Sequence, residues 1–132
     1  MPLMFLNGTG MSGQATHWIV GDSPLVATTT TAPRYRFHAV AGAYPALEDV
    51  GVGGASIVGE VYDVSYEQFR EVLLPAEPPG LELGVIELAD GSGSFAMVLR
   101  RDHALSDETV DISHLGSWRD YQQRRQEEAP AE

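Results

Sequence analysis

The chain has 132 residues, the size of one domain, and 43% of them are hydrophobic, which is enough to build a buried core. It has 19 acidic residues against 8 arginines and no lysine, and the net charge of −11 disfavours nucleic acid and anionic membranes as partners. The absence of cysteine excludes disulfides, thiolate catalysis and cysteine-ligated zinc. We see no signal peptide and no apolar run of about 18 residues, so we expect a cytoplasmic protein.

A short apolar segment at residues 4–6 runs into a loop that carries three glycines within residues 8–13. A strand followed by Asn7-Gly8 is typical of a tight turn. Glycines there permit positive φ angles, and successive N–H groups of such a turn can surround an anion or a carboxylate. The loop is therefore either a ligand-binding loop or an ordinary hairpin turn.

The next segments combine strand and turn signals. Residues 14–20 are compatible with a short helix or an extended cover, and residues 25–31 are rich in β-branched side chains, which predicts a strand. Residues 35–40 alternate with aromatic side chains on one face and predict a second strand. Residues 41–54 contain several glycines and a proline, which predicts a long surface loop without regular structure.

The clearest strand of the sequence spans residues 55–64. Ser65 then opens a capping box, which predicts a helix over residues 66–74, and the prolines that follow end this helix. Residues 81–88 and 94–100 are two strands separated by turn residues, and together they predict a β-hairpin.

The last part of the chain predicts a polar loop at residues 101–109, a helix from residue 113 to about residue 126, and an acidic, frayed tail at residues 127–132. The total is about six strands and two helices, joined mostly by short turns. This arrangement favours an α+β fold: a small mixed, mostly antiparallel β-barrel or curled sheet with helices packed outside. We expect residues 1–126 to form a single domain.

Seven short motifs lie along the chain, and their order and spacing together are more specific than any one of them. They are GTGMSG at residues 8–13, TAPRYR at 31–36, GGASI at 53–57, EVY at 60–62, LGVIEL at 83–88, DIS at 111–113 and GSWRDY at 116–121. Together they cover nearly the whole chain, which resembles the γ-glutamylcyclotransferase-like superfamily. The chain is most similar to the C-terminal domain of allophanate hydrolase, here as a free-standing protein. The resemblance implies a small mixed α/β barrel.

The resemblance also implies that the loop after the first strand holds the polar head of a substrate through its backbone N–H groups. The residues that would bind the substrate are Asn7, Gly8, Thr9, Gly10 and Met11. In the cyclotransferases a tyrosine usually stands at the first of these positions, and the asparagine found here would add a side-chain donor.

Catalysis in the superfamily rests on a glutamate shortly after the helix, which acts as a general acid/base, and Glu77 is the best match to it. A carboxyl group in an apolar cleft suits this task because burial raises its pKa toward neutrality. Prolines flank Glu77, however, and the allophanate hydrolase branch generally lacks this glutamate. Glu77 is then a real catalytic base, a catalytic relic, or an exposed acid at the end of a helix.

Other candidate residues have simpler interpretations. We expect Glu60 to face solvent on its strand, the alternative being a carboxylate in the mouth of the barrel. Tyr35 is expected to pack in the core, with a hydroxyl that can reach a ligand at the barrel end. Arg34 and Arg36 are simplest as surface charges, although either has the geometry to bind a carboxylate with two hydrogen bonds. The histidines lack the spacing of metal ligands, and we expect neither a metal nor a cofactor.

Three functions stay open. The first is an enzyme that acts on a small carboxylate-bearing amide or urea-type metabolite, with Glu77 as its general acid/base. The second is a non-catalytic accessory subunit that binds and supports an amidase or allophanate hydrolase. The third is a small-molecule binding module without turnover. The sequence leaves open whether the chain forms a homodimer.

Overall fold

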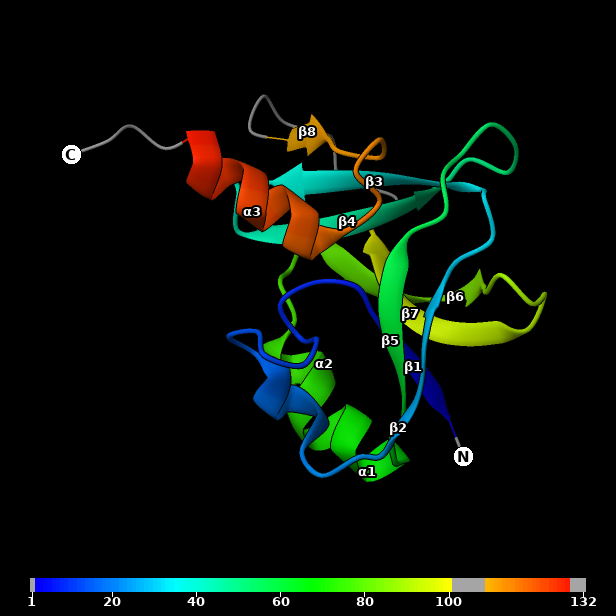
Figure 1. Cartoon of the computed structure of the whole chain (residues 1–132). Coiled ribbons are helices and arrows are strands. Elements are labelled where there is room, and N and C mark those ends of the chain that lie inside the picture. Colours follow the sequence, from blue (N-terminus) through cyan, green and yellow to red (C-terminus); the bar gives the residue numbers. More distant parts are fainter. Residues whose placement is uncertain (1, 101–108, 129–132) are drawn as a thin grey trace.

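The computed structural model describes residues 2–100 and 109–128, and the strands in them form an eight-stranded sheet that curls on itself (Figure 1). The strands are β1 (Leu3–Leu6), β2 (Leu25–Thr30), β3 (Tyr35–Val40), β4 (Tyr44–Asp49), β5 (Val58–Asp63), β6 (Leu81–Glu87), β7 (Gly93–Leu99) and β8 (Thr109–Asp111). The helical segments are η1 (His17–Val20), α1 (Tyr66–Gln68), η2 (Phe69–Leu73), α2 (Leu74–Ala76) and α3 (Trp118–Glu128). The polar loop expected at residues 101–109 lies almost wholly outside the described residues.

The strand order is β2-β5-β1-β7-β4-β3-β8, and β6 pairs with β7 as the other half of a hairpin. Among the described strands, the β1–β7 and β4–β7 pairs are parallel and the other pairs are antiparallel. In Figure 1, β3, β4, β8 and α3 lie at one end of the molecule, and η1 with α1 and α2 lies at the other. The expected α+β fold, a mixed and mostly antiparallel curled sheet with helices outside it, is confirmed.

The first strand, β1, lies in the middle of this sheet between β5 and β7. Its side chains from Met4 to Leu6 are buried in the hydrophobic core. On the neighbouring strand β5, a Cβ at Gly59 would overlap the ring of Phe5, so only glycine permits this close approach. The loop that follows β1 therefore begins at a rigid, buried strand.

The prediction of a surface loop over residues 41–54 is wrong for its first half. Tyr44–Asp49 forms β4, which pairs along its whole length with β3. The turn between the two strands has positive φ angles at Ala41 (52°) and Gly42 (66°), as a tight hairpin requires. Ala-Gly is a weak signal for such a turn. Pro45 is tolerated because it lies at the start of the strand.

The expected helix over residues 66–74 is confirmed as a continuous helical run from residue 66 to residue 76. The Ser65 hydroxyl accepts the N–H of Gln68 at 3.1 Å, which is the predicted cap. The middle of the run, η2, widens into a π-helical turn and buries Phe69 and Leu73 against the sheet. The run ends where the site described below begins.

The final helix begins later than expected from residue 113, because Gly116 has a positive φ angle of 64° and turns the chain first. Its first residue, Trp118, is fully buried, and the ring of Tyr121 packs on it at 5.0 Å between centroids. The helix continues to Glu128, so the first residues of the expected frayed tail are helical.

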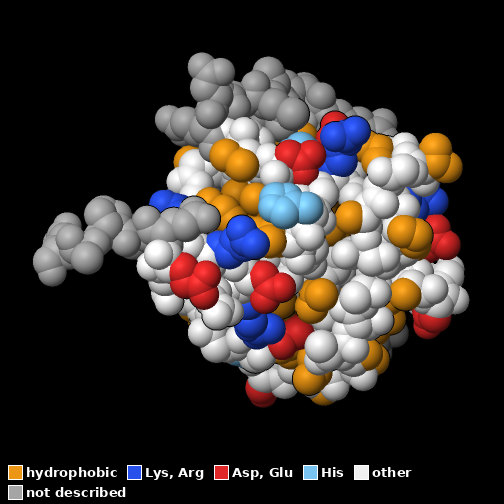
Figure 2. Space-filling view, turned by 45° about the horizontal axis from the view of Figure 1, so that its top comes forward, with side chains coloured by type: hydrophobic (Ala, Val, Ile, Leu, Met, Phe, Trp, Pro, Cys, Tyr) orange, Lys and Arg blue, Asp and Glu red, His pale blue; other side chains and the backbone are white. Residues whose placement is uncertain are grey.

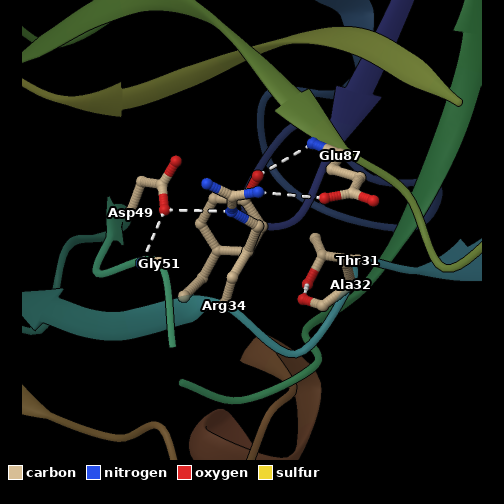
Figure 3. A network of polar contacts seen from close by, with 7 residues as sticks. Thr31, Ala32, Arg34, Asp49, Gly51 and Glu87 are labelled. Carbon is tan, nitrogen blue, oxygen red and sulfur yellow. Dashed lines mark hydrogen bonds and ion pairs between the residues drawn. The ribbon is translucent and has the colours of Figure 1, made fainter. Parts of the chain in front are cut away.

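Arg34 connects β4 and β6 (Figure 3). Its guanidinium lies 3.1 Å from the Asp49 carboxylate at the end of β4 and 3.0 Å from the Glu87 carboxylate at the end of β6. Next to it, the Tyr35 hydroxyl accepts the backbone N–H of Glu87 at 2.8 Å. Arg34 is half-exposed, as expected for a surface charge. Both of its ion pairs are made within the fold, to residues at the ends of strands.

Figure 2 shows the face that carries α3 and β3, where acidic and basic side chains are interspersed with hydrophobic ones. No large area of a single charge sign is visible on that face. No helix within the described ranges is long and apolar enough to cross a membrane.

Candidate ligand-binding site

The loop after β1 is held by hydrogen bonds to its own carbonyl groups. The three carbonyls of residues 8–10 accept, in order, the Met11 N–H at 3.1 Å, the Thr16 N–H at 2.9 Å and His17 Nδ1 at 2.9 Å. The N–H groups of the same three residues donate to no other described residue. Unpaired backbone N–H groups in a turn are available to donate to an anion.

Residues 8–10 line a small cavity of about 40 Å³. Apolar side chains from β1, β4, β6 and β7 form part of its wall, and Asn7, Thr9, Tyr44 and Glu77 are its polar members. A space of this size holds a few water molecules or one carboxylate-sized group. The body of a larger ligand would lie outside it.

Glu77 reaches the cavity because the helical run stops at Ala76 and the next residue is extended, with φ −76° and ψ 148°. Its side chain is half-buried and forms no hydrogen bond or ion pair within the described part of the chain. Burial raises the pKa of Glu77 to about 7. At neutral pH this carboxyl group is therefore able both to accept and to donate a proton.

Two further features of the wall concern the first residues of the loop. The Asn7 Nδ2 group is buried and has no hydrogen-bond partner among the described residues. An unsatisfied buried donor costs roughly 1–3 kcal/mol, which a ligand oxygen at this position would recover. A Cβ at Gly8 would overlap the ring of Pro45, so β4 can cover the loop this closely only because residue 8 is glycine.

The structure thus brings five of the expected site residues to one cavity: Asn7, Gly8, Thr9, Gly10 and Glu77. Two expected residues do not line it. Met11 is 1% exposed and packs in the hydrophobic core. Tyr35 borders a separate hollow of about 570 Å³ formed by β4, β6 and β7, and its hydroxyl is engaged by Glu87.

The expectation that Glu60 faces solvent is wrong, because its side chain is only 7% exposed. Its carboxylate accepts hydrogen bonds from Ser12 and Tyr62. Strand alternation separates the two faces of residues 55–64 but does not say which face is inside. The available signal in the sequence was Gly59, because a glycine inside a strand often marks a close approach of other atoms. In the structure the ring of Phe5 takes this space.

Solved structures similar to this chain include an AIG2-like protein from Mus musculus, with a TM-score of 0.63 and 20% identity over 79% of this chain and 80% of that one. The chain has the γ-glutamylcyclotransferase-like fold. The family model of the allophanate hydrolase C-terminal domain matches residues 2–123. The chain therefore belongs to the allophanate hydrolase C-terminal domain family.

Two other solved structures show how this domain occurs in longer and shorter chains. The uropathogenic E. coli-specific protein c4763 is 30% identical, with a TM-score of 0.84, and the match covers 92% of this chain and 95% of that one. The K. lactis urea amidolyase is 24% identical, with a TM-score of 0.88, and the match covers 95% of this chain but 8% of that one. The comparison with curated protein sequences finds no significant match.

Proposed function

We propose that this protein binds, and acts on, a small carboxylate-bearing amide or a urea-type metabolite at the cavity beside the loop. One observation carries the proposal: Glu77, whose pKa is raised to about 7, lines the same cavity as residues 8–10, whose backbone N–H groups have no acceptor among the described residues. The N–H groups of residues 8–10 and Asn7 Nδ2 bind the carboxylate or carbonyl oxygen of the ligand. Glu77 exchanges protons with its nitrogen.

In this scheme Glu77 works in both protonation states. The carboxylate form removes a proton from the attacking amine or water as it bonds to the carbonyl carbon, and the acid form then gives that proton to the nitrogen as the C–N bond breaks. The oxygen that gains negative charge in the transition state lies on the N–H groups of residues 8–10, where fixed donors stabilise it. The cavity admits only the reacting group, so the ligand is small or extends outward.

A thermal-shift screen tests this proposal. The ligands are γ-glutamyl amines, 5-oxoproline, malonate, urea derivatives and allophanate, and a ligand that binds only the folded state raises the melting temperature. We expect a hit that Asn7→Ala weakens, and turnover of that hit that Glu77→Gln abolishes while binding remains. Glu67→Gln, an exposed glutamate on α1, is the matched control. Binding without turnover would favour a binding module, and no shift at millimolar ligand would contradict the proposal.

A second candidate, an accessory subunit for an amidase, is favoured by an apolar hollow of about 450 Å³ at the helical run. Its members include Tyr66, Phe69, Leu74, Leu83 and Phe95, and the Tyr66 side chain is largely exposed. The family's domain is also a small part of longer chains such as urea amidolyase.

The test of this second function is binding to a purified allophanate hydrolase amidase domain. We expect Leu83→Glu to abolish the complex, because it places a charge in the apolar hollow. Val52→Glu is the control, since Val52 is 90% exposed and lies away from the hollow. Absence of a complex with the unaltered protein would count against an accessory role.

A further inference from the structure

We infer that Glu60 is a positioning residue for the ligand loop and that it holds the loop through Ser12, with Arg119 as the second clamp. The ligand part of this inference rests on the proposed function. The positioning itself concerns the free protein. The two parts can therefore be tested separately.

The contact between Glu60 and Ser12 is double. Glu60 Oε1 accepts the Ser12 backbone N–H at 2.7 Å, and Oε2 accepts the Ser12 hydroxyl at 2.7 Å. Tyr62, two residues along β5, donates its hydroxyl to Oε1 at 3.0 Å. Three donors on one carboxylate, which is the acceptor-only form of the side chain, make a strong, charge-assisted anchor.

Arg119 fixes the other side of Ser12. Its Nη2 donates to the Ser12 carbonyl at 2.6 Å and lies 3.5 Å from Glu60 Oε2. One turn further along α3, Gln122 donates to the side chain of Gln14 at 3.0 Å. The last residues of the loop are thus held between the buried strand β5 and the last helix.

The contact between Glu60 and Ser12 affects the cavity because Ser12 belongs to the same loop as the residues that line it. Ser12 follows the residues that line the cavity, and Met11 between them is buried in the core. The carbonyls of residues 8–10 are fixed by donors from Met11, Thr16 and His17. With Ser12 also fixed, the backbone of residues 8–10 is held in one conformation before any ligand arrives, which is the preorganisation that a binding loop needs.

Glutamine is the sharpest replacement for Glu60. It keeps the size of the side chain but sets an NH₂ group against the donors of Ser12, so at least one of the two contacts is lost. The matched control is Tyr35→Phe, which removes a partly buried hydrogen bond to Glu87 away from the loop cavity. Both variants lose stability, but only one of them touches the loop.

The experiment is NMR of backbone amides at one fixed pH, in three samples: wild type, Glu60→Gln and Tyr35→Phe. We expect hydrogen exchange at the Ser12 amide to be roughly ten-fold faster in Glu60→Gln only, which corresponds to the loss of one buried hydrogen bond. We also expect the amide shifts of residues 8–10 to move in that variant only. Unchanged exchange and shifts in Glu60→Gln would overturn the inference.

Acetate, as the simplest carboxylate, then tests the ligand part. If acetate shifts the amides of residues 8–10 in wild type, we expect several-fold weaker binding in Glu60→Gln and wild-type binding in Tyr35→Phe. Equal affinity in all three proteins would overturn the positioning role in binding. If wild type binds no carboxylate, the proposed function fails, while the exchange data still decide whether Glu60 positions the loop.

A second pair of variants covers the case in which Glu60→Gln does not fold. Ser12→Ala removes one hydroxyl of an exposed residue, and with it the hydrogen bond to Glu60 Oε2, while Arg119→Gln shortens a side chain that is 43% exposed, so neither variant removes a core side chain. We expect each to move the amides of residues 8–10 in the same direction as Glu60→Gln, by a smaller amount. No movement in either variant would overturn the inference.

Discussion

The ring of Pro45 packs so closely over Gly8 that a Cβ placed on residue 8 would overlap it. The covering strand and the ligand loop are therefore fitted to each other without a side chain between them. Gly8→Ala should destabilise the protein by roughly 1–3 kcal/mol, because the added methyl group forces the loop or β4 to move. Chemical denaturation measures this difference.

The same substitution should also remove ligand binding at the loop cavity. Gly93→Ala is the matched control, since a Cβ there meets its nearest neighbour, Val85, only at an ordinary 3.6 Å. A Gly8→Ala protein with unchanged stability would show that Pro45 moves away freely.

Glu77 should make stability depend on pH near neutrality. Burial raises the pKa of Glu77 to about 7, above its value in the unfolded chain, so its contribution is fully present below pH 4 and is lost as the pH rises through 7. Above pH 7, Glu77→Gln should be more stable than wild type by about 3 kcal/mol at most. The ¹³C shift of the Glu77 carboxyl should titrate with a midpoint near 7, and a midpoint below 5 would contradict the burial of this side chain.

Glu60 should show the opposite dependence. Burial alone would raise the pKa of Glu60, but the hydrogen bonds from Ser12 and Tyr62 and the charge of Arg119 outweigh it and lower the pKa. Its contribution is therefore present above the ordinary glutamate range and lost as the pH falls below it. Glu60→Gln should cost roughly 1–3 kcal/mol at pH 7. The difference from wild type should shrink in acid, and a constant difference from pH 3 to pH 8 would argue against an ionised Glu60.

Tyr35 should matter for stability and not for the ligand. Tyr35→Phe leaves the Glu87 N–H without its acceptor, which should cost about 1–2 kcal/mol. Ligand affinity at the loop should stay at the wild-type value, because Tyr35 does not line that cavity. A clear loss of affinity in calorimetric titration would restore Tyr35 to the list of binding residues.

Local signals predicted most of the strands and both long helical segments. The cap at Ser65, the hairpin of β6 and β7 and the alternation in β3 each depend on a few neighbouring residues. The strand β4 was missed because its turn uses Ala41-Gly42 and its second residue is proline. Such a strand is stabilised by its partner β3 and by burial, and neither is visible in a short window of sequence.

Part of the candidate site was also predictable from the sequence, but not from local signals alone. The glycine-rich loop was recognised from its own pattern as a possible binding loop, and Glu77 was found through a family resemblance; Gly8, Gly10 and Glu77 do line one cavity. The buried Glu60 was missed because its partners, Ser12 and Arg119, are 48 and 59 positions away in the chain. Contacts between residues so far apart in the chain leave no periodic pattern in the sequence. Only the folded structure shows that Glu60 is buried and accepts hydrogen bonds there.

The central place of β1 has a consequence for how the chain acquires its structure. Both partners of β1, β5 and β7, follow it in the chain, and the loop after β1 bonds to Arg119, 107 residues away from Ser12. Nascent β1 therefore has no lasting partner until most of the chain has been synthesised. Folding must wait for distant segments to meet, which predicts slow kinetics for a chain of this length and a need for the apolar β1 to be shielded in the interval.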